Sequence, residues 1–398
     1  MKVKQSILAI TLLTTASSAA LAAAPAYKLK DLGVAHQGDR SAAYSISNTS
    51  LITGYARMRV PTGPGEDMRT STQAARFYHE TDYVDVIGGM GYDGGHGSTI
   101  GRAINDSGLV AGYGPIPGTP RKYQAFVHHY KTGFMENIGT LGDGPESRAY
   151  GINNNGKVVG WSNTQADGSD NVAFVYDSST RTMEQLQGPL LGGSRSFAFD
   201  INDSDVIVGA ATTPDGSAHA FKYHNGMAMD LGSLDNSGYA EARAINESGM
   251  VTGFSLDANN NYTAFIFDDT NGMQSLQGLG GDSFGYDINE AGQVVGNATD
   301  ANGDRTAFLY SDGQMYDLYD LLSASDQALI KSISAAYGIN DDGTVVGLAN
   351  FWTDKDAGRS ARRAFMLTAV PLPGAVFFMA PALGLLGLIG KKRTQASA

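Results

Sequence analysis

The protein has 398 residues, of which 51 are glycine, 17% are charged and none is cysteine. This composition favours many short strands joined by tight turns over a helical or disordered chain, and it suits an exported protein that does not depend on disulfide bonds. The formal net charge is −12 and the basic residues are scattered singly. This pattern argues against a nucleic-acid partner, because phosphate binding requires a clustered basic surface.

Residues 1–22 have the three parts of a secretory signal peptide. Lys2 and Lys4 form a basic start, an apolar segment runs from Ile7 to Leu13, and Ala20-Leu21-Ala22 is a small-residue cleavage site. The apolar segment is too short to span a bilayer stably, so we expect cleavage after Ala22 and export of the rest. The alternative is an apolar N-terminal segment of the folded core.

A nine-residue pattern, I-N-x-x-G-x-V-V-G, recurs seven times at intervals of 43 to 58 residues. This period lies at or just above the roughly 40–50 residues of a four-stranded propeller blade. The clean copies begin at Ile152, Ile288 and Ile339, the looser copies at Ile104, Ile201 and Ile245, and a degraded copy at Ile46.

The residues of one repeat predict four antiparallel strands. A first strand ends at Ile152, the segment Asn153–Gly156 turns, and a second strand follows at Lys157. Asparagine can hydrogen-bond its own backbone at the start of such a turn, and glycine accepts the left-handed conformation at its end. A small residue followed by Phe opens an alternating third strand, and Asn-Gly pairs such as Asn225-Gly226 signal the turn into a fourth.

The third-strand string occurs once in every repeat, and a Leu or Ile before glycine follows it, as in Asp230-Leu231-Gly232. Together these strings resemble the HAF repeat of extracellular bacterial proteins, and His219-Ala220-Phe221 matches its name. The resemblance covers about Tyr27 to Leu367 and implies little about biochemical activity. The third-strand strings are Ala75-Arg76-Phe77, Ala125-Phe126, Ala173-Phe174, Ala220-Phe221, Ala264-Phe265, Ala307-Phe308 and Ala364-Phe365.

The two ends of the repeat region complement each other. The last repeat has no fourth string after Leu367, whereas an unattached fourth string, Leu29–Gly33, precedes the first repeat. If this N-terminal strand completes the last blade, no sheet edge stays open. We therefore predict an all-β fold, a single seven-bladed β-propeller over residues 27–367, with a β-sandwich pair or a solenoid as the alternative.

One segment has a helical spacing of apolar residues. Between Tyr319 and Ala335, Leu321, Leu322, Leu329, Ile330 and Ile333 recur at this spacing, with Ser323 or Ser325 as the cap. We expect a helix that is inserted between blades and packs against the ring.

The strand order places the long loops on the opposite face of the ring from the Asn-x-x-Gly turns. We call the two faces the long-loop face and the Asn-turn face. Binding residues concentrate in loops of variable length on a rigid scaffold, and we expect an anionic polysaccharide on the long-loop face, with guanidinium groups pairing its carboxylates. The alternative is that these residues pack on their own blade or are solvated. The candidates are Trp161, Trp352, Arg359, Arg362 and Arg363, with further arginines at Arg57, Arg59 and Arg69.

No catalytic centre, cofactor site or metal site is predicted. His128 and His129 are neighbours in a strand, so their side chains point to opposite faces and cannot easily share a metal. Asp300, Asn302 and Asp304 alternate as in a calcium loop, but the later glycine and glutamate of such loops are missing. A pair of catalytic carboxylates could still be formed by the loops, and sequence spacing cannot reveal it.

The C-terminus, residues 370–398, contains a motif, an apolar segment and a basic cluster. The motif is Val370-Pro371-Leu372-Pro373-Gly374, residues 375–390 are apolar, and Lys391-Lys392-Arg393 follows. The apolar run is about as long as the shortest transmembrane helix, and the basic cluster should stay cytoplasmic. A simple membrane anchor would have the same features.

This tail resembles the PEP-CTERM sorting signal in its V-P-L-P-G-A form, with Leu372 where the class name has Glu. The resemblance implies recognition by an exosortase, a membrane transpeptidase, in a Gram-negative bacterium that makes exopolysaccharide. We therefore expect a protein of the cell surface or extracellular matrix that is anchored transiently in the inner membrane. Its expected role is that of a non-enzymatic binding or structural component associated with exopolysaccharide, and the alternative is a secreted polysaccharide-active enzyme.

Overall fold

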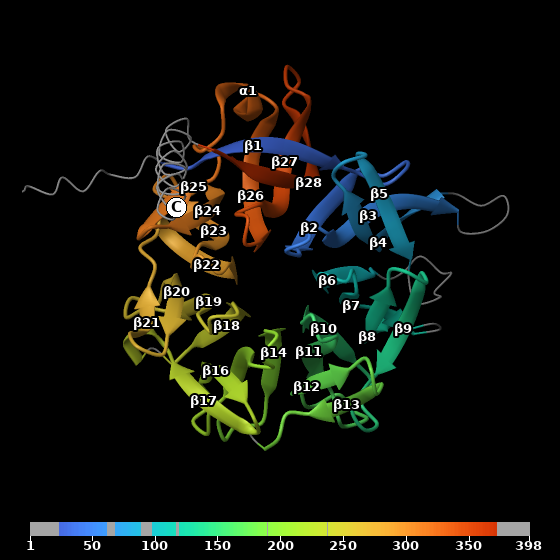
Figure 1. The fold of residues 1–398 in the computed structure, drawn as a ribbon, viewed down its shortest axis with the longest axis vertical. Helices are drawn as coiled ribbons and strands as arrows, with labels where there is room; N and C mark the ends of the chain where they lie inside the picture. The colour runs from blue at the N-terminus through green and yellow to red at the C-terminus, as the bar shows by residue number, and fades with distance from the viewer. Residues whose placement is uncertain are drawn as a thin grey trace, which may run out of the picture.

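The computed structural model describes residues 24–61, 68–88, 98–116, 119–188, 190–236 and 238–371. In these residues the chain forms seven four-stranded antiparallel sheets arranged around a central axis (Figure 1). The fold is a seven-bladed β-propeller, as the repeats predict.

Blades 1 to 6 each consist of four strands that are consecutive in the chain and run from the axis outward. Blades 1 to 3 are β2 (Arg40–Ile46), β3 (Ile52–Pro61), β4 (Met68–Tyr78) and β5 (Tyr83–Gly88); β6 (Ile100–Ile104), β7 (Val110–Ile116), β8 (Thr119–His129) and β9 (Phe134–Gly139); β10 (Ser147–Ile152), β11 (Lys157–Ser162), β12 (Val172–Asp177) and β13 (Thr182–Gln185). Blades 4 to 6 are β14 (Ser196–Ile201), β15 (Ile207–Thr212), β16 (Ala218–His224) and β17 (Met227–Gly232); β18 (Ala240–Ile245), β19 (Val251–Leu256), β20 (Tyr262–Asp268) and β21 (Gly272–Ser275); β22 (Gly280–Ile288), β23 (Val294–Asp300), β24 (Arg305–Ser311) and β25 (Gln314–Asp317). A short 3-10 helix, η1 (Leu234–Asn236), joins blades 4 and 5.

Blade 7 closes the ring with strands from both ends of the described chain. Its inner strands are β26 (Ile330–Ile339), β27 (Val345–Asp354) and β28 (Arg359–Val370), and its outer strand is β1 (Ala26–Gly33). The antiparallel register pairs Leu29 with Leu367 and Ala26 with Val370. The predicted closure by the N-terminal strand is therefore confirmed, and Ala26 and Val370 lie side by side.

The recurring Phe of the third strand forms the core between blades. It is fully buried in blades 2 to 7, as is the alanine before it. In blade 5, for example, Phe265 packs in one cluster with Val208 and Ala220 of blade 4. Burial of each such ring contributes about 2–3 kcal/mol, and seven repetitions hold the blades face to face.

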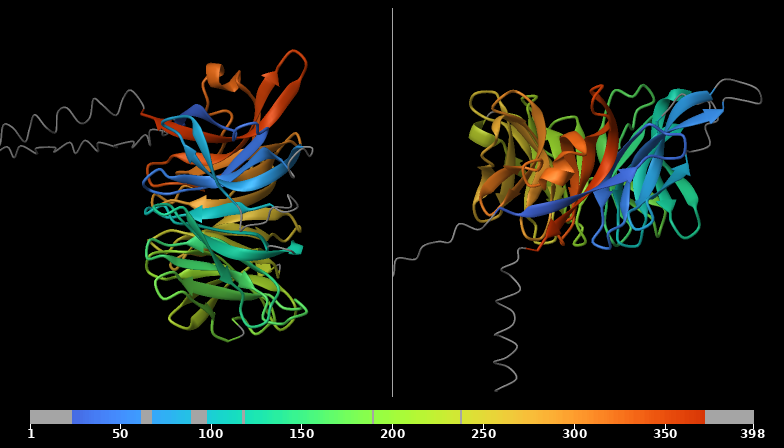
Figure 2. Two further views of the ribbon diagram at one scale, coloured as in Figure 1. Left: turned by 90° about the vertical axis from the view of Figure 1, so that its right-hand side faces the viewer. Right: turned by 90° about the horizontal axis from the view of Figure 1, so that it is seen from above.

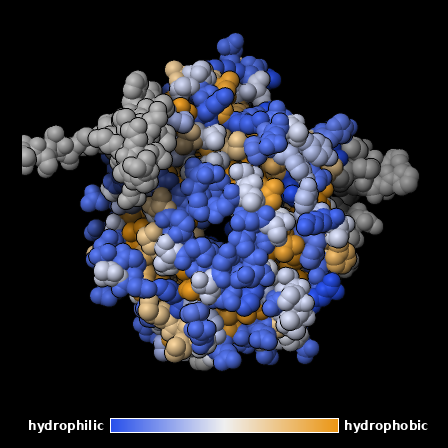
Figure 3. All heavy atoms as spheres, in the orientation of Figure 1, coloured by the Kyte–Doolittle hydropathy of each residue, from blue (hydrophilic) through white to orange (hydrophobic). Residues whose placement is uncertain are grey.

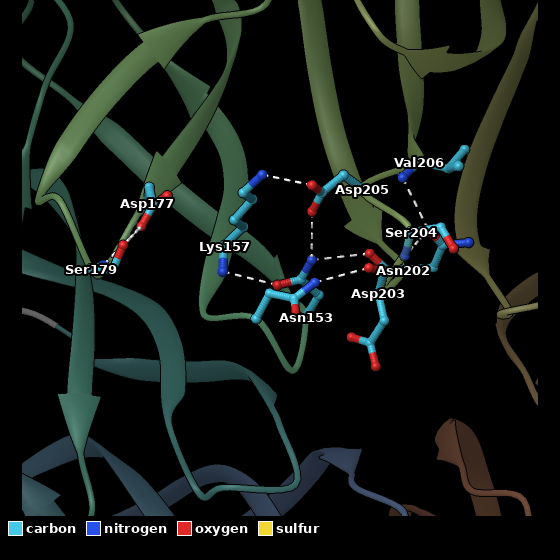
Figure 4. A network of polar contacts seen from close by, with 10 residues as sticks. Asn153, Lys157, Asp177, Ser179, Asn202, Asp203, Ser204, Asp205 and Val206 are labelled. Carbon is cyan, nitrogen blue, oxygen red and sulfur yellow. Dashed lines mark hydrogen bonds and ion pairs between the residues drawn. The ribbon is translucent and has the colours of Figure 1, made fainter.

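The recurring Asn links each blade to the next on the Asn-turn face. Its Oδ1 accepts from the backbone N–H four residues on, which shapes the turn, and its Nδ2 donates to the carbonyl of the corresponding residue in the next blade. Asn153, for example, accepts from Lys157 N at 2.9 Å and donates to Asn202 O at 3.0 Å (Figure 4). The same pair of bonds is made by Asn105, Asn153, Asn202, Asn246, Asn289 and Asn340.

Blade 1 is the exception, because Ser47 stands in the place of this Asn. Its hydroxyl still accepts from the backbone N–H groups of Thr49 and Leu51. The link to blade 2 comes instead from Thr49, whose hydroxyl donates to Asp106 O at 3.2 Å. The ring of inter-blade hydrogen bonds, which we call the asparagine ring, is therefore continuous.

The predicted helix between Tyr319 and Ala335 is wrong for most of its length. The segment forms one helical turn, α1 (Ala324–Gln327), capped by Ser323, whose Oγ accepts from Asp326 N. From Ile330 the chain is strand β26, in which Ile330 and Ile333 are buried and Leu329 just before it is exposed. The apolar spacing matched a helix, but pairing with β27 and burial in the ring decided the structure.

In the described part of the chain, no helix is long and apolar enough to cross a membrane. The predicted signal peptide, residues 1–22, lies outside the described residues, as do Leu372, Pro373 and Gly374 of the sorting motif and the apolar segment 375–390. Figure 2 shows that the hairpin of β27 and β28 projects on the side of the ring opposite to the Asn-turn face.

Candidate axial binding site

Every inner strand carries a one-residue bulge at the same position. In blade 1 the register passes from Ala43–Gly54 to Ser45–Thr53, so Tyr44 has no partner in the ladder. Such bulges redirect a side chain and are common next to functional sites. The seven bulged residues line a single cavity of 280 Å³ on the propeller axis, which we call the axial cavity. They are Tyr44, Arg102, Tyr150, Phe199, Arg243, Tyr286 and Tyr337.

The last glycine of the repeat makes room for this bulge. A Cβ on Gly160 would lie 1.9 Å from the carbonyl oxygen of Arg148, and one on Gly209 would lie 1.9 Å from that of Phe197. The corresponding glycines of the other blades have the same environment: Gly54, Gly112, Gly253, Gly296 and Gly347. Glycine is required here for close backbone approach and not for a left-handed turn.

Two arginines stack on the aromatic rings of the axial cavity. The Arg102 guanidinium carbon lies 4.6 Å from the Tyr44 ring centroid and 5.2 Å from that of Tyr150. Arg243 lies 4.1 Å from Phe199 and forms an ion pair with Glu241. The Arg102 guanidinium forms no ion pair and no hydrogen bond with any residue that the structure describes. Its charge is therefore held by cation–π contacts and is not neutralised by a carboxylate.

Three tyrosines of the cavity, Tyr44, Tyr286 and Tyr337, stay neutral. Burial raises the pKa of Tyr44, against the opposing effect of Arg102, and burial likewise raises the pKa of Tyr286 and Tyr337. Their hydroxyls are thus available as hydrogen-bond donors and acceptors at every physiological pH. The cavity combines fixed positive charge, aromatic faces and hydroxyl groups.

The next layer of the channel, toward the Asn-turn face, contains two carboxyl groups. Asp200 and Asp287 directly follow Phe199 and Tyr286 and border a second cavity of 180 Å³. The Asp200 carboxylate accepts from Ile245 N at 3.0 Å, and that of Asp287 accepts from Ile339 N at 2.8 Å, each in the following blade. Burial raises the pKa of Asp200 to about 7 and that of Asp287 to about 8, with acidic neighbours adding to the effect.

The Asn-turn mouth of the channel is a ring of acceptor side chains, and Figure 3 shows hydrophilic residues around the opening at the centre of this face. Each accepts from a backbone N–H of the preceding blade; Asp203, for example, accepts from Asn154 N at 2.7 Å. We call these residues the acidic mouth: Asn48, Asp106, Asn154, Asp203, Glu247, Glu290 and Asp341. The channel is therefore negative at this mouth and positive in the axial cavity.

Of the residues predicted from sequence, Trp161 lies next to the aromatic layer. Its ring contacts Phe197 edge-on with centroids 6.1 Å apart, Phe197 stacks parallel to Phe199, and Arg148 lies 5.4 Å from the Trp161 ring. The axial residues were not among those predicted from the sequence. A signal was present, however, because the position two before the recurring Ile is aromatic or Arg in all seven repeats.

The other predicted residues lie on the hairpin of blade 7 and are not gathered around one cavity. Trp352 is partly exposed on β27, and Arg359 is exposed at the start of β28. Arg362 borders a separate cavity beside Asp39, and Arg363 forms an ion pair with Asp31 at 2.8 Å. Of the further arginines, Arg57 pairs with Asp39.

The other residues considered for metal binding have structural partners or lie apart. His128 is buried, and burial followed by the nearby Arg76 lowers its pKa. Asp300 accepts from the backbone N–H groups of Asn302 and Asp304, which shapes a tight turn. Among the described residues there is no group of three or more His, Cys, Asp or Glu side chains able to hold a metal ion.

Comparison with known proteins supports the fold and leaves the function open. The chain matches a family described as a protein of unknown function, DUF3466, over residues 67–230 and again over residues 194–335. No curated protein sequence matches it. It is similar in structure to acylaminoacyl peptidase of Pyrococcus horikoshii, with a TM-score of 0.50 and 11% identity over 87% of this chain and 55% of that one. It also resembles TolB of Acinetobacter baumannii, with a TM-score of 0.44 and 16% identity over 67% of this chain and 63% of that one. It thus spans less than two thirds of either protein.

Proposed function

The chain belongs to the DUF3466 family, and we propose that it is an exported, non-enzymatic binding component of an exopolysaccharide-containing matrix. The observation that carries this proposal is Arg102, a guanidinium without a carboxylate partner among the described residues, inside a cavity lined by aromatic rings. A buried or partly buried cation without a counter-ion is unfavourable, and an anionic ligand removes this penalty.

The cavity suits one acidic sugar residue. Ligand sites are typically concave, with aromatic walls and a few polar groups that fix orientation, and a guanidinium pairs a carboxylate with two parallel hydrogen bonds. The volume of 280 Å³ is near the lower limit of such sites. We therefore propose that the axial cavity takes a terminal or branching residue of an anionic polysaccharide and not a long stretch of the polymer.

The two ends of the sequence support export. Residues 1–22 have the form of a signal peptide, and residues 370–398 have the form of a PEP-CTERM tail after HAF-like repeats. An exosortase-type enzyme is the proposed partner for sorting, with transient inner-membrane anchoring of a cell-surface protein. Val370 is paired with Ala26 on the Asn-turn face, so an anchor that follows it would leave the long-loop face directed outward.

Glycan-array binding by the purified protein and by its Arg102→Gln variant tests this function. We expect the protein to bind glycans with uronic acid residues and to ignore neutral ones, and Arg102→Gln to weaken binding at least tenfold. Arg181→Gln is the matched control, because this guanidinium is exposed on blade 3, outside the channel. Trp161→Ala and Trp352→Ala test whether the long-loop face extends the site. Absence of binding to every acidic glycan would refute the proposal.

One observation favours a second candidate, a secreted polysaccharide-active enzyme. Asp200 and Asp287 form a pair of carboxyl groups beside the axial cavity, and an elevated carboxyl pKa is typical of a general acid. Both pKa values are raised, however, so at neutral pH neither carboxyl group is fully in the carboxylate form that the second residue of a glycosidase pair requires. Incubation with acidic polysaccharides and measurement of new reducing ends or unsaturated ends distinguishes the two: turnover that Asp200→Asn abolishes would favour the enzyme.

A further inference from the structure

The layer of Asp200 and Asp287 is unlike the corresponding layer of the other blades. The residue before the recurring Ile is Ser45, Ala103, Gly151, Ala244 or Gly338 elsewhere, so two of seven positions carry a carboxyl group. Both directly follow residues of the axial cavity, Phe199 and Tyr286. An anion held by Arg102 and Arg243 would therefore have these carboxyl groups as its neighbours along the axis.

No positive charge compensates these two carboxyl groups on the Asn-turn side. Asp200 and Asp287 form no ion pair within the described part of the chain, and their oxygens accept from backbone N–H groups. The acidic mouth beyond them contributes Asp106, Asp203, Glu247, Glu290 and Asp341. A negative charge on Asp200 or Asp287 is thus opposed from the mouth and would in turn oppose an anion in the axial cavity.

We propose that the axial channel binds a carboxylate-bearing sugar together with a proton, and that Asp200 and Asp287 hold this proton. The anion is bound when these two groups are neutral and is released when they ionise. This inference rests on the proposed function and specifies its ligand and its control. In the neutral form each carboxyl group can also donate a hydrogen bond to a sugar hydroxyl or carboxylate, which an ionised group cannot do.

The titration range follows from the groups along the channel. The pKa of Asp200 is about 7 and that of Asp287 about 8, so both change charge between about pH 6 and pH 9. The guanidinium groups of the axial cavity are those of Arg102 and Arg243. The phenols of Tyr44, Tyr286 and Tyr337 stay neutral in this range, since burial raises their pKa values. On the mouth side the neighbouring carboxyl groups are Asp106, Asp203, Glu247, Glu290 and Asp341, and burial raises the pKa of Glu247. No histidine or lysine lines either cavity among the described residues.

Titration calorimetry with methyl β-D-glucuronide as the probe, at pH 6, 7, 8 and 9, tests the inference. We expect the affinity to fall at least about tenfold from pH 6 to pH 9, because the ionised carboxyl groups of Asp200 and Asp287 then repel the anion bound in the adjacent axial cavity. Near pH 8 the heat of binding should depend on the ionisation enthalpy of the buffer, which reports proton uptake. The neutral methyl β-D-glucoside should bind more weakly and without pH dependence.

The double variant Asp200→Asn, Asp287→Asn keeps the shape of both side chains and one acceptor oxygen on each for the N–H groups of Ile245 and Ile339. It should bind the glucuronide equally at pH 6 and pH 9. Asp203→Asn is the matched control, because it removes a charge from the acidic mouth outside this layer and should leave the pH profile unchanged. Circular dichroism confirms folding of both variants.

The outcomes separate the inference from the proposed function. Binding of the glucuronide that is equally tight at pH 6 and pH 9 in the unmodified protein overturns the inference and leaves the proposed function standing. A pH profile that Asp203→Asn flattens as much as the double variant also overturns it, because the whole mouth would then be responsible. No binding of the glucuronide at any pH overturns both.

Discussion

The asparagine ring and the axial cavity lie on the same inner strands, a few residues apart, yet they differ in how far the blades resemble one another. Six of seven blades have Asn in the ring, and all seven have glycine opposite the bulge. The bulged position itself is Tyr in four blades, Arg in two and Phe in one. Positions that must satisfy the same backbone geometry in every blade are uniform, whereas positions that face the channel vary and make an asymmetric site.

The largest effect is expected at the uniform glycines. Gly160→Ala places a Cβ against the Arg148 carbonyl, which is backbone and cannot move without disturbing the bulge. We expect a loss of about 3 kcal/mol in the free energy of unfolding, measured by urea titration. Gly216→Ala is the control: this glycine has a positive φ but nothing within 4 Å of an added Cβ, so the loss should be about 1 kcal/mol. Equal losses would contradict our account of the bulge.

Replacement of Asp200 and Asp287 by Asn should make the folded protein more stable at high pH. The pKa of Asp200 and Asp287 in the folded protein lies above the ordinary value of 3.8, so the folded state binds more protons than the unfolded state between about pH 4 and pH 8. Stability therefore falls as pH rises through this range and levels off above it. The double variant Asp200→Asn, Asp287→Asn should avoid this decline and exceed the unmodified protein by about 2 kcal/mol at pH 9.

The measurement is the thermal unfolding midpoint of both proteins from pH 5 to pH 9. Parallel curves would contradict the raised pKa values. Another outcome is a double variant that is more stable and has lost the pH dependence of acidic-sugar binding. That result would show that Asp200 and Asp287 serve binding at the expense of stability, unlike the uniform positions of the asparagine ring.

Removal of one ring asparagine should have an effect of similar size. Asn153→Ala deletes the bonds to Asn202 O, Asp205 Oδ1 and Lys157 N and leaves buried backbone groups without partners. We expect a loss of about 2 kcal/mol in urea unfolding. Asn155→Ala, two residues away in the same turn, removes an exposed bond to Asp203 O and should cost less than about 0.5 kcal/mol. A reversed order would refute the structural role of the ring.

The smallest effect is expected where the ring departs from its pattern. Ser47→Asn should allow an Nδ2 donor to reach the blade 2 turn, as the other six asparagines do, and stabilise the protein by about 0.5–1 kcal/mol. Ser47→Ala is the control and should be destabilising, because the Ser47 hydroxyl accepts from Thr49 N and Leu51 N. If Ser47→Asn destabilises the protein, the hydrogen bond from Thr49 to Asp106 O leaves no room for an Asn side chain at position 47.

The architecture was predictable from the sequence because the same pattern recurs in every blade. Seven copies of one pattern predict seven blades, and the unattached string at Leu29–Gly33 predicts closure by β1, which the pairing of β1 with β28 confirms. The assignment of Asn153 to a turn was correct but incomplete. Its Oδ1 shapes the turn as expected, while its Nδ2 crosses to blade 4, a contact between residues 49 positions apart.

The candidate site was not predictable by the same route. Trp161, Trp352 and the arginines of β28 were selected for residue type and loop position, and the structure distributes them over two blades. Tyr44, Arg102 and Phe199 are unremarkable in any single repeat, since each reads as one more residue of an alternating strand. The predicted helix at Tyr319–Ala335 failed for a related reason, because a short apolar spacing fits a helix or a strand until tertiary pairing selects one.

The sequence by itself determined the number of blades, the order of strands, the turns and the way in which the ring closes, because these depend on local turn chemistry and on apolar alternation that recurs in every repeat. The tertiary structure alone decided which side chains meet on the axis. A bulge shifts one residue per blade out of the ladder, and closure of seven blades brings residues as distant as Tyr44 and Tyr337 into contact, with ring centroids 4.9 Å apart. The charge gradient from the acidic mouth to Arg102 exists only once that ring is closed.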